Sequence, residues 1–170
     1  MPTFMHFKAA YSLIYNNVFK KEFSMDAYKD YEISCKKIKN VNQVLLTDFK
    51  TWLMSMGLAS KTIEKHISNI NFFINEYLLY EDAIEAIDGV HHVSMFLGDW
   101  FIRKATWASP SSIKSNAASI KKFYDFMVAK NLVKQEDLDS LAKTIKEEMP
   151  TWLSMMKSYD QKLFEMDDDY

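Results

Sequence analysis

The sequence predicts an all-α protein, built as a compact orthogonal bundle of several helices. Turn residues are scarce, since the 170 residues include 3 Gly and 3 Pro, too few for a fold made of tight hairpins. Apolar residues recur at helical spacing along the chain, and a helix, a turn and a second helix follow one another between Phe49 and Tyr80. Hydrophobic residues make up 48% of the sequence, so a chain of this length can bury one core.

The stretch from Phe49 to Tyr80 carries the clearest signals. Its first helix ends at Gly57, where a left-handed C-terminal cap is expected, and Ser60 is positioned to cap the second helix. The second helix presents one apolar stripe, made of Ile63, Ile67, Ile70, Ile74 and Tyr77.

The preceding residues are predicted to form separate helices. An amphipathic helix covers residues 4–19, and a second helix begins at the cap Ser24 and ends near Asn40 and Asn42. The next helix, over residues 44–56, is the first of the pair described above.

After the pair, an acidic turn over residues 81–89 precedes a helix over residues 91–104. Ser109 followed by Pro110 places a cap before a proline at the first helical position, which predicts a helix from there to about Lys130. This helix repeats the apolar pattern of the Ser60 helix at an offset of 50 residues, which indicates two similar helical hairpins.

The last 37 residues are predicted to form two helices, over 134–149 and 151–166, because Pro150 is expected to break the pattern. Residues 167–170, with three Asp, form an acidic tail.

Charge runs from basic to acidic along the chain. Residues 1–43 hold seven Lys and four acids, whereas residues 134–170 hold five Lys and ten acids. The basic cluster at residues 36–39 is interpreted as a solvated helix end. Because Arg103 is the only arginine, contacts with nucleic acid would depend on lysine as a point charge, which positions a protein better than it reads sequence.

The sequence offers little reaction chemistry. Asp88, His91 and His92 are the best metal candidates, and they are too few for a closed ligand set, so no metal and no cofactor are predicted. Neither a Gly-flanked nucleophile turn nor a Gly-rich phosphate loop is present. Cys35 stands alone and no stretch has the length of a membrane span, so we expect a cytoplasmic protein that is not an enzyme and does not enter a membrane.

Two sequence motifs indicate more than the fold class. The turn after the first helix is Gly57-Leu58-Ala59-Ser60-Lys61-Thr62-Ile63. Some 50 residues later, the chain carries Ser109, Ser112, Ile113, Ile120, Phe123, Tyr124 and Phe126. Both elements resemble the N-terminal SAM-like, core-binding domain of phage integrases and related tyrosine recombinases. The likeness covers about residues 44–133, which leaves 1–43 as an N-terminal helical extension and 134–170 as C-terminal helices with the acidic tail.

In that family the core-binding domain lies across duplex DNA. The resemblance therefore implies a DNA-binding protein related to mobile elements or phages, with a part in DNA recombination or integration. Helix starts and lysines would meet the phosphates. The residues implied are Lys61, Thr62, Lys65, Ser111, Ser112, Lys114, Lys121 and Lys122.

The chain departs from the family in one large respect. Tyrosine recombinases cut DNA with a separate C-terminal domain that carries two Arg, Lys, His and a nucleophilic Tyr. This sequence has one arginine and no His followed three residues later by Arg. We therefore expect no strand-exchange catalysis from this chain.

Three functions compete at this stage. The first is non-catalytic binding of duplex DNA, which predicts salt-sensitive affinity. The second is a protein-interaction module on the same helical fold, with a protein partner or a homodimer and no affinity for nucleic acid. The third is an enzyme whose pocket gathers His and carboxylates from distant helices, and it ranks last.

Overall fold

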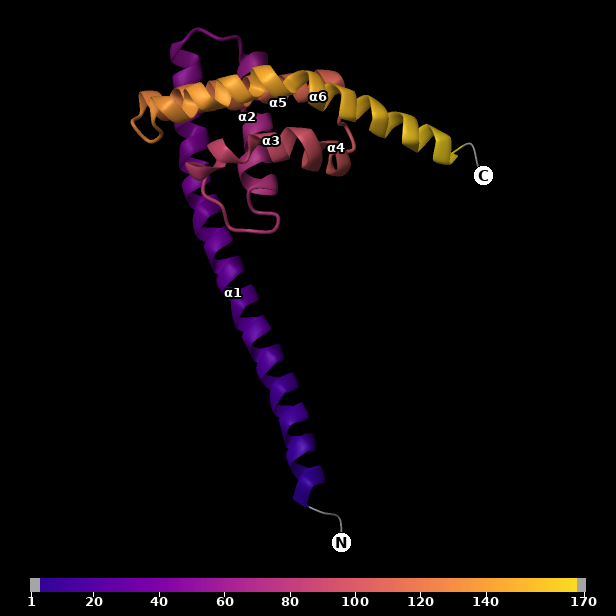
Figure 1. Ribbon diagram of the computed structural model, residues 1–170. Coiled ribbons are helices and arrows are strands. Elements are labelled where there is room, and N and C mark those ends of the chain that lie inside the picture. The colour runs from indigo at the N-terminus through magenta and orange to yellow at the C-terminus, as the bar shows by residue number, and fades with distance from the viewer. Residues whose placement is uncertain (1–3, 168–170) are drawn as a thin grey trace. The chain divides into compact units, whose positions relative to one another are not determined.

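A computed structural model describes residues 4–167, with side chains described for residues 26–162 and 165. Every regular element in these residues is helical (Figure 1), which confirms the all-α prediction. Chain contacts divide the protein into two units, Met1–Lys37 and Ile38–Tyr170. The elements are α1 (Phe4–Ser55), α2 (Ser60–Phe72), η1 (Phe73–Tyr77), η2 (Asp88–His91), α3 (Val93–Met95), η3 (Phe96–Trp100), α4 (Phe101–Lys104), α5 (Pro110–Ala129) and α6 (Gln135–Asp167).

Helix α1 runs without interruption from Phe4 to Ser55. The predicted helix ends after residue 19 and near Asn40 and Asn42, together with the new start at Ser24, are therefore wrong. The first unit contains the early part of α1, where the rings of Tyr28 and Tyr31 lie 6.4 Å apart. The predicted acidic tail falls mostly on residues 168–170, outside the described residues.

In the second unit, Asn42 explains why α1 does not end where the sequence suggests. Its side chain is buried, and its Nδ2 donates hydrogen bonds to the carbonyl oxygen of Ile74 (3.1 Å) and to Oδ1 of Asn75 (2.8 Å). Because a buried amide needs partners, these bonds offset part of the cost of burying Asn42, whose Oδ1 is buried without a partner. They also join α1 to the helix that begins at Ser60. Asparagine often ends a helix, but here Asn42 connects two helices.

Helix α5 occupies the centre of the second unit. Ile113, Ile120, Phe123 and Tyr124 are fully buried, and α5 packs against both α2 and α6. From α1, the ring of Phe49 meets the ring of Phe123 edge-on at 5.3 Å. Burying large apolar and aromatic side chains in this way supplies about 1.5–3 kcal/mol each, so α5 anchors the core.

The caps of α5 and α1 agree with the sequence, and that of α2 does not. Ser109 and Ser112 form a reciprocal capping box at the start of α5, with Pro110 in the first turn. Gly57 after α1 has φ +73°, the left-handed value expected there. The predicted cap Ser60 is instead the first residue of α2, and Ala59 precedes it without a side-chain cap bond.

The predicted helix over residues 91–104 is built from several pieces. The 3-10 turn η2 precedes the short α3, the π-helical turn η3 and α4. A second π-helical turn, η1, ends the helix that starts at Ser60. In η3, Gly98 is covered by Trp152 of α6, which lies so near that a Cβ added at Gly98 would come within 2.7 Å of the indole Cδ1.

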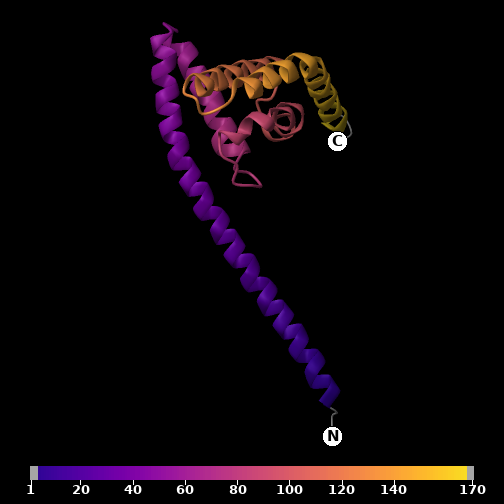
Figure 2. The ribbon, with the colours of Figure 1, turned by 60° about the vertical axis from the view of Figure 1, so that its left-hand side comes forward.

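Helix α6 contains Pro150 without breaking, so the predicted division into two helices is wrong. Pro150 and Lys146, whose carbonyl lacks its usual N–H partner, are both exposed, and water can satisfy that carbonyl. Figure 2 shows α6 changing direction partway along its length, the bend that a proline inside a helix is expected to cause. Within residues 4–167, none of the helices combines the length and the hydropathy of a segment that crosses a bilayer.

Replacing Gly98 with alanine should lower the free energy of unfolding by about 1–3 kcal/mol, because the new methyl group overlaps the Trp152 indole. Urea denaturation of Gly98→Ala, Trp152→Leu and the double variant measures the effect. The double variant should lose less than the sum of the two single variants, since the smaller side chain makes room for the methyl group. Strict additivity would show that the two residues do not clash.

Replacing Tyr124 with phenylalanine should also cost about 1–3 kcal/mol of unfolding free energy. The buried Tyr124 hydroxyl donates a 2.8 Å hydrogen bond to the carbonyl of Ala86, which would be left buried and unpaired. Tyr159→Phe is the control, because that half-buried hydroxyl bonds to no described residue. Equal urea midpoints for Tyr124→Phe and the wild type would contradict the expected loss.

Candidate functional site

Helices α2 and α5 meet along a line of polar side chains, here called the polar seam: His66 and Asn69 of α2, and Ser115 and Ser119 of α5. Nδ1 of His66 lies 2.8 Å from Oγ of Ser119, and Nδ2 of Asn69 donates to both serine hydroxyls, at 3.0 and 2.9 Å. As numbers rise along α2 they fall along α5, so the two helices are antiparallel where they touch.

The hydrogen bonds of Ser119 are all satisfied together by one tautomer of His66. The single hydroxyl proton of Ser119 is donated to the carbonyl of Ser115 at 3.0 Å, so its oxygen accepts the other bonds. Nδ1 of His66 must then carry the proton that points at Ser119, which leaves Nε2 as the basic nitrogen. A proton taken up by His66 therefore goes to Nε2.

Lysines from both helices act on this histidine. Partial burial lowers the pKa of His66, and the positive charges of Lys122 on α5 and Lys65 on α2 lower it further. Two cations from different helices thus converge on one edge of the polar seam. An anion bound there would be attracted by both.

The structure separates the predicted DNA-contacting residues into two groups. Lys61, Thr62 and Lys65 are exposed in the first turns of α2, and Lys121 and the half-buried Lys122 lie in the second half of α5. Because the helices are antiparallel, these two places lie at the same end of the seam. The remaining three residues, Ser111, Ser112 and Lys114, lie near the other end of α5.

Ser111 and Ser112 take part in the start of α5. The Ser112 hydroxyl accepts the backbone N–H of Ser109 at 2.8 Å and also lies 3.0 Å from the Ser109 carbonyl. The Ser111 hydroxyl lies 3.1 Å from the Ser109 hydroxyl. At 1.5 Å per residue, Ser111 is about 16 Å along the helix from Lys122. One short ligand cannot touch both, whereas an extended polyanion can.

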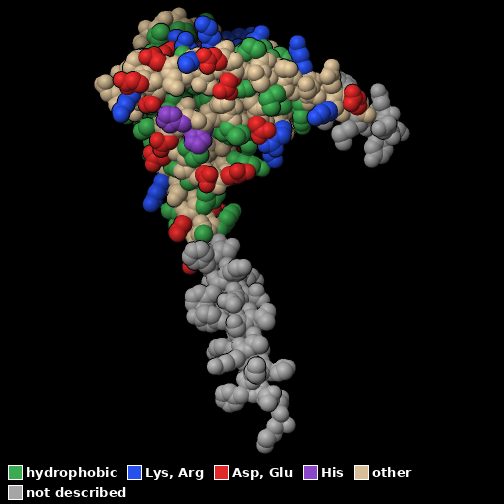
Figure 3. Space-filling view, in the orientation of Figure 1, with side chains coloured by type: hydrophobic (Ala, Val, Ile, Leu, Met, Phe, Trp, Pro, Cys, Tyr) green, Lys and Arg blue, Asp and Glu red, His purple; other side chains and the backbone are tan. Residues whose placement is uncertain are grey.

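Acidic side chains interrupt the positive charge. Asp125 lies 4.0 Å from Lys122, a weak surface pair, and Glu64 is exposed beside Lys65. Lys and Arg are also interspersed with Asp and Glu on the face drawn in Figure 3. The positive charge at the polar seam is therefore local.

The His66–Ser119 contact does not make a nucleophile. Ser119 has an exposed fraction of 0%, so a substrate carbonyl cannot reach its oxygen, and its proton is donated to the Ser115 carbonyl. The pair fixes the packing of α2 on α5. Among the described side chains, no group of three or more His, Cys, Asp or Glu is arranged to hold a metal ion.

A second feature, here called the aromatic cleft, lies between the end of the Ser60 helix and the segment η2 to α4. It has a volume of about 240 Å³. The residues that line it are Tyr77, Leu78, Tyr80, Glu81, Asp82, Ile84, His92, Met95, Asp99, Trp100 and Arg103.

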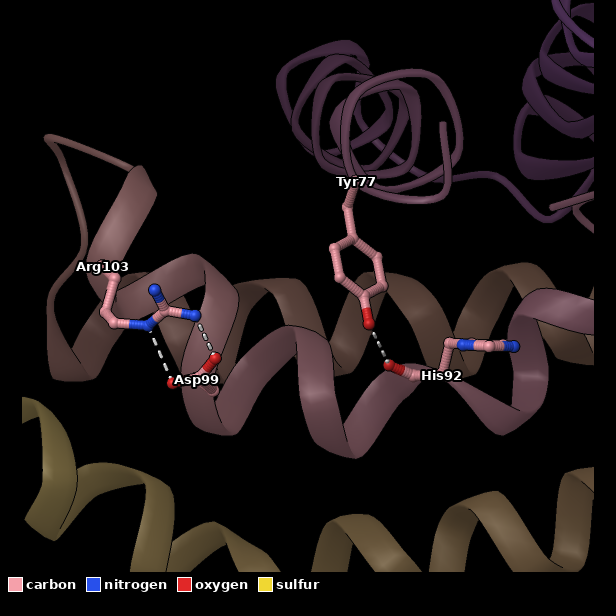
Figure 4. Close-up of polar contacts among 4 residues, drawn as sticks. All are labelled: Tyr77, His92, Asp99 and Arg103. Atoms are coloured by element: carbon pink, nitrogen blue, oxygen red, sulfur yellow. Dashed lines mark hydrogen bonds and ion pairs between the residues drawn. The ribbon is translucent and has the colours of Figure 1, made fainter. Parts of the chain in front are cut away.

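Polar contacts hold the aromatic cleft in shape. Figure 4 shows the Tyr77 hydroxyl pointing at the backbone carbonyl of His92, to which it donates a 3.2 Å hydrogen bond. On the same helical segment as His92, Arg103 forms a two-pronged ion pair with Asp99, with Nε 2.8 Å from Oδ1. The hydrogen bond from Arg103 lowers the pKa of the Asp99 carboxyl, so Asp99 stays charged.

Neither the polar seam nor the aromatic cleft was predicted from the sequence. His66 and Asn69 lie next to the apolar stripe of α2, and Ser115 and Ser119 are four residues apart on α5, so a polar pair on each helix was visible. No pattern in the sequence showed that the two pairs face each other. Trp107, in the loop before α5, is 56% exposed, and its ring lies 5.0 Å from that of Phe72.

No protein-family model matches the chain, and neither the curated proteins nor the solved structures contain a significant match.

Replacing Lys122 with glutamine should raise the pKa of His66, because one of the two nearby positive charges is removed. NMR titration of the imidazole C–H signals measures the shift. Lys121→Gln is the matched control, since that neighbouring lysine does not contribute to the lowered pKa. Equal pKa values of His66 in both variants would show that Lys122 does not act on the seam.

The lowered pKa of His66 also determines whether stability rises or falls with pH. The pKa of His66 is lower in the folded chain than its ordinary value of 6.5, so the unfolded chain binds more protons. The contribution of His66 to stability is therefore complete above pH 6.5 and declines as the pH falls from 6.5 through the folded pKa. In Lys122→Gln, urea midpoints should decline less over this interval.

Proposed function

We propose that this chain is a non-catalytic protein that binds duplex DNA through the polar seam and its lysines, in the manner of the core-binding domain of tyrosine recombinases. The observation that carries the proposal is the 2.8 Å contact of His66 with Ser119, which brings Lys65, next to His66, and Lys122, one turn after Ser119, to the same edge of the seam. Phosphate groups are bound by such local concentrations of positive charge, with affinity that depends on released counterions.

The arrangement of α2 and α5 supports contact with a polyanion. Lys61 and Thr62 lie in the first turn of α2, where backbone N–H groups and the helix dipole favour negative charge. Lys121 lies at the same end of the seam on α5, and Lys114 is two turns away on the same side of that helix. Lysines along one helix at this spacing can meet successive phosphates.

The chemistry available here supports binding without sequence readout. The candidate contacts are lysine ammonium groups and hydroxyls, which bind phosphate oxygens and carry little information about bases. We also propose that the helical fold is of the SAM-like integrase type.

The test is fluorescence anisotropy of a labelled duplex at several salt concentrations. Changing Lys114, Lys121 and Lys122 together to glutamate should weaken binding about tenfold or more and reduce the salt slope by up to ~0.9 for each phosphate that a lysine no longer neutralises. The decrease in affinity should be equal for duplexes of unrelated sequence, because phosphates are the same in all.

The control changes Lys143, Lys146 and Lys157 of α6 to glutamate, which alters the net charge by the same amount and also affects exposed lysines. This control should retain most of the affinity. Equal decreases in the two triple variants would mean that net charge alone attracts the duplex, and no binding by the wild type would refute the proposal. Circular dichroism shows whether each variant keeps its helices.

The alternative is a protein-interaction module on the same fold. One observation favours it: Val41 and Val44, one turn apart on α1, are 59% and 60% exposed. A flat DNA titration combined with a molecular mass that rises with concentration in sedimentation would favour this alternative. Val44→Glu should then reduce the association.

A further inference from the structure

The aromatic cleft is independent of the polar seam and is built from different elements. Three aromatic side chains line it: Tyr77, Tyr80 and Trp100. The ring of Trp100 lies 5.3 Å from that of Tyr77 and 5.4 Å from that of Tyr80, with interplanar angles of 61° and 70°. Rings at these distances are in direct edge-to-face contact, so the three side chains form one continuous aromatic wall of the cleft.

The backbone that carries these rings is unusual. Tyr77 is the last residue of the π-helical turn η1, and Trp100 is the last residue of the π-helical turn η3. Single π-helical turns are rare and occur often at functional sites, because the extra residue redirects the side chains that follow. Two of them contribute one ring each to the same cleft.

The charges around the cleft favour a cation. Three carboxylates line it, from Glu81, Asp82 and Asp99. Among these, Asp99 is paired with Arg103, whereas Glu81 and Asp82 are exposed and form no ion pair with a described side chain. With Arg103 included, the cleft is lined by three carboxylates and one guanidinium group, so negative charge is in excess. Burial raises the pKa of the Tyr77 hydroxyl, and the negative charges of Asp99 and Glu81 raise it further.

One ring of the cleft already holds a cation from its own chain. The ammonium group of Lys104, which does not line the cleft, lies 5.3 Å from the centre of the Tyr80 ring. Tyrosine and tryptophan faces attract ammonium groups at this distance through the ring quadrupole. The same attraction is available to a cation placed against the wall formed by the three rings.

The size of the cleft limits what can enter. A volume of about 240 Å³ is below the roughly 300–1,000 Å³ of sites for whole drug-sized ligands. Met95, which is 61% exposed, adds a flexible apolar wall. The cleft is therefore suited to one compact group with an apolar surface and a positive charge.

We propose that the aromatic cleft binds an alkylammonium cation against the aromatic wall formed by Tyr77, Tyr80 and Trp100, with the carboxylates of Glu81 and Asp82 at its edge. Two sources supply this chemistry: a free quaternary ammonium compound, and the methylated or unmodified lysine side chain of a polypeptide. Both present a positive charge spread over apolar carbon atoms.

The experiment follows the indole N–H signal of Trp100 by NMR during titration with choline chloride, against sodium chloride at equal ionic strength. The signal is assigned from its disappearance in Trp100→Phe. We expect a saturable shift with choline and about threefold or more weaker binding of 3,3-dimethylbutan-1-ol, which has the same shape without the charge. Equal binding of the two compounds, or no saturable shift, would overturn the proposal.

The variant that tests the carboxylates is the pair Glu81→Gln and Asp82→Asn, which should weaken choline binding about threefold or more. Its control is the pair Glu76→Gln and Glu85→Gln, which removes two exposed acids from the same part of the chain that do not line the cleft. Equal weakening in both pairs would show a nonspecific effect of net charge and would also overturn the proposal.

Two further titrations distinguish a free quaternary ammonium compound from the lysine side chain of a polypeptide. The N-acetyl amides of lysine and of trimethyllysine replace choline in the same titration. Tighter binding of a blocked amino acid than of choline supports a polypeptide ligand, and tighter binding of choline supports a free compound. Tyr80→Leu, which keeps an apolar side chain and removes the ring, should weaken every one of these cations. Unchanged affinity in Tyr80→Leu would remove that ring from the site.

Discussion

The burial of α5 between α2 and α6 is the constraint on which the rest of the second unit depends. A polar side chain buried on such a helix is stabilised when it is hydrogen-bonded, because an unpaired buried group costs more free energy than its hydrogen bond contributes. Ser119 meets this condition by donating to the Ser115 carbonyl and accepting from α2. Asn116 meets it in part: its Nδ2 donates to the Ser112 carbonyl, one turn earlier, whereas its Oδ1 is buried without a hydrogen-bond partner.

This condition also fixes the position of α2 on α5. A shift by one turn would separate Asn69 from Ser115 and Ser119, and it would leave buried hydroxyls facing apolar side chains. Polar contacts of this kind select one arrangement among several that apolar packing alone would allow. Lys65 and Lys122 are therefore held on the same edge of the seam by contacts that neither lysine makes. The local positive charge is a consequence of how the core is packed.

The sequence predicted the parts of the fold that depend on local signals. The capping box at Ser109, the left-handed Gly57 and the apolar faces of α2 and α5 were all predicted, since each arises within a few residues. The predicted helix ends at Asn42 and Pro150 were wrong because whether the helix continues there depends on contacts outside the local sequence. Asn42 finds partners on a distant helix, and Pro150 lies on an exposed side of α6 where water replaces the missing bond.

The candidate sites also combine features with local sequence signals and features that depend on contacts between distant residues. Individual lysines on α2 and α5 could be named from the sequence, but their convergence required the antiparallel contact of His66 with Ser119. The aromatic cleft gave no local signal, because the helical period fails where the π-helical turns η1 and η3 each add a residue. An aromatic residue at regular spacing is expected to face the core. Tyr77 and Trp100, each the last residue of a π-helical turn, pack against the core and also line the cleft, so their rings lie in the same cleft as the carboxylates of Glu81 and Asp82.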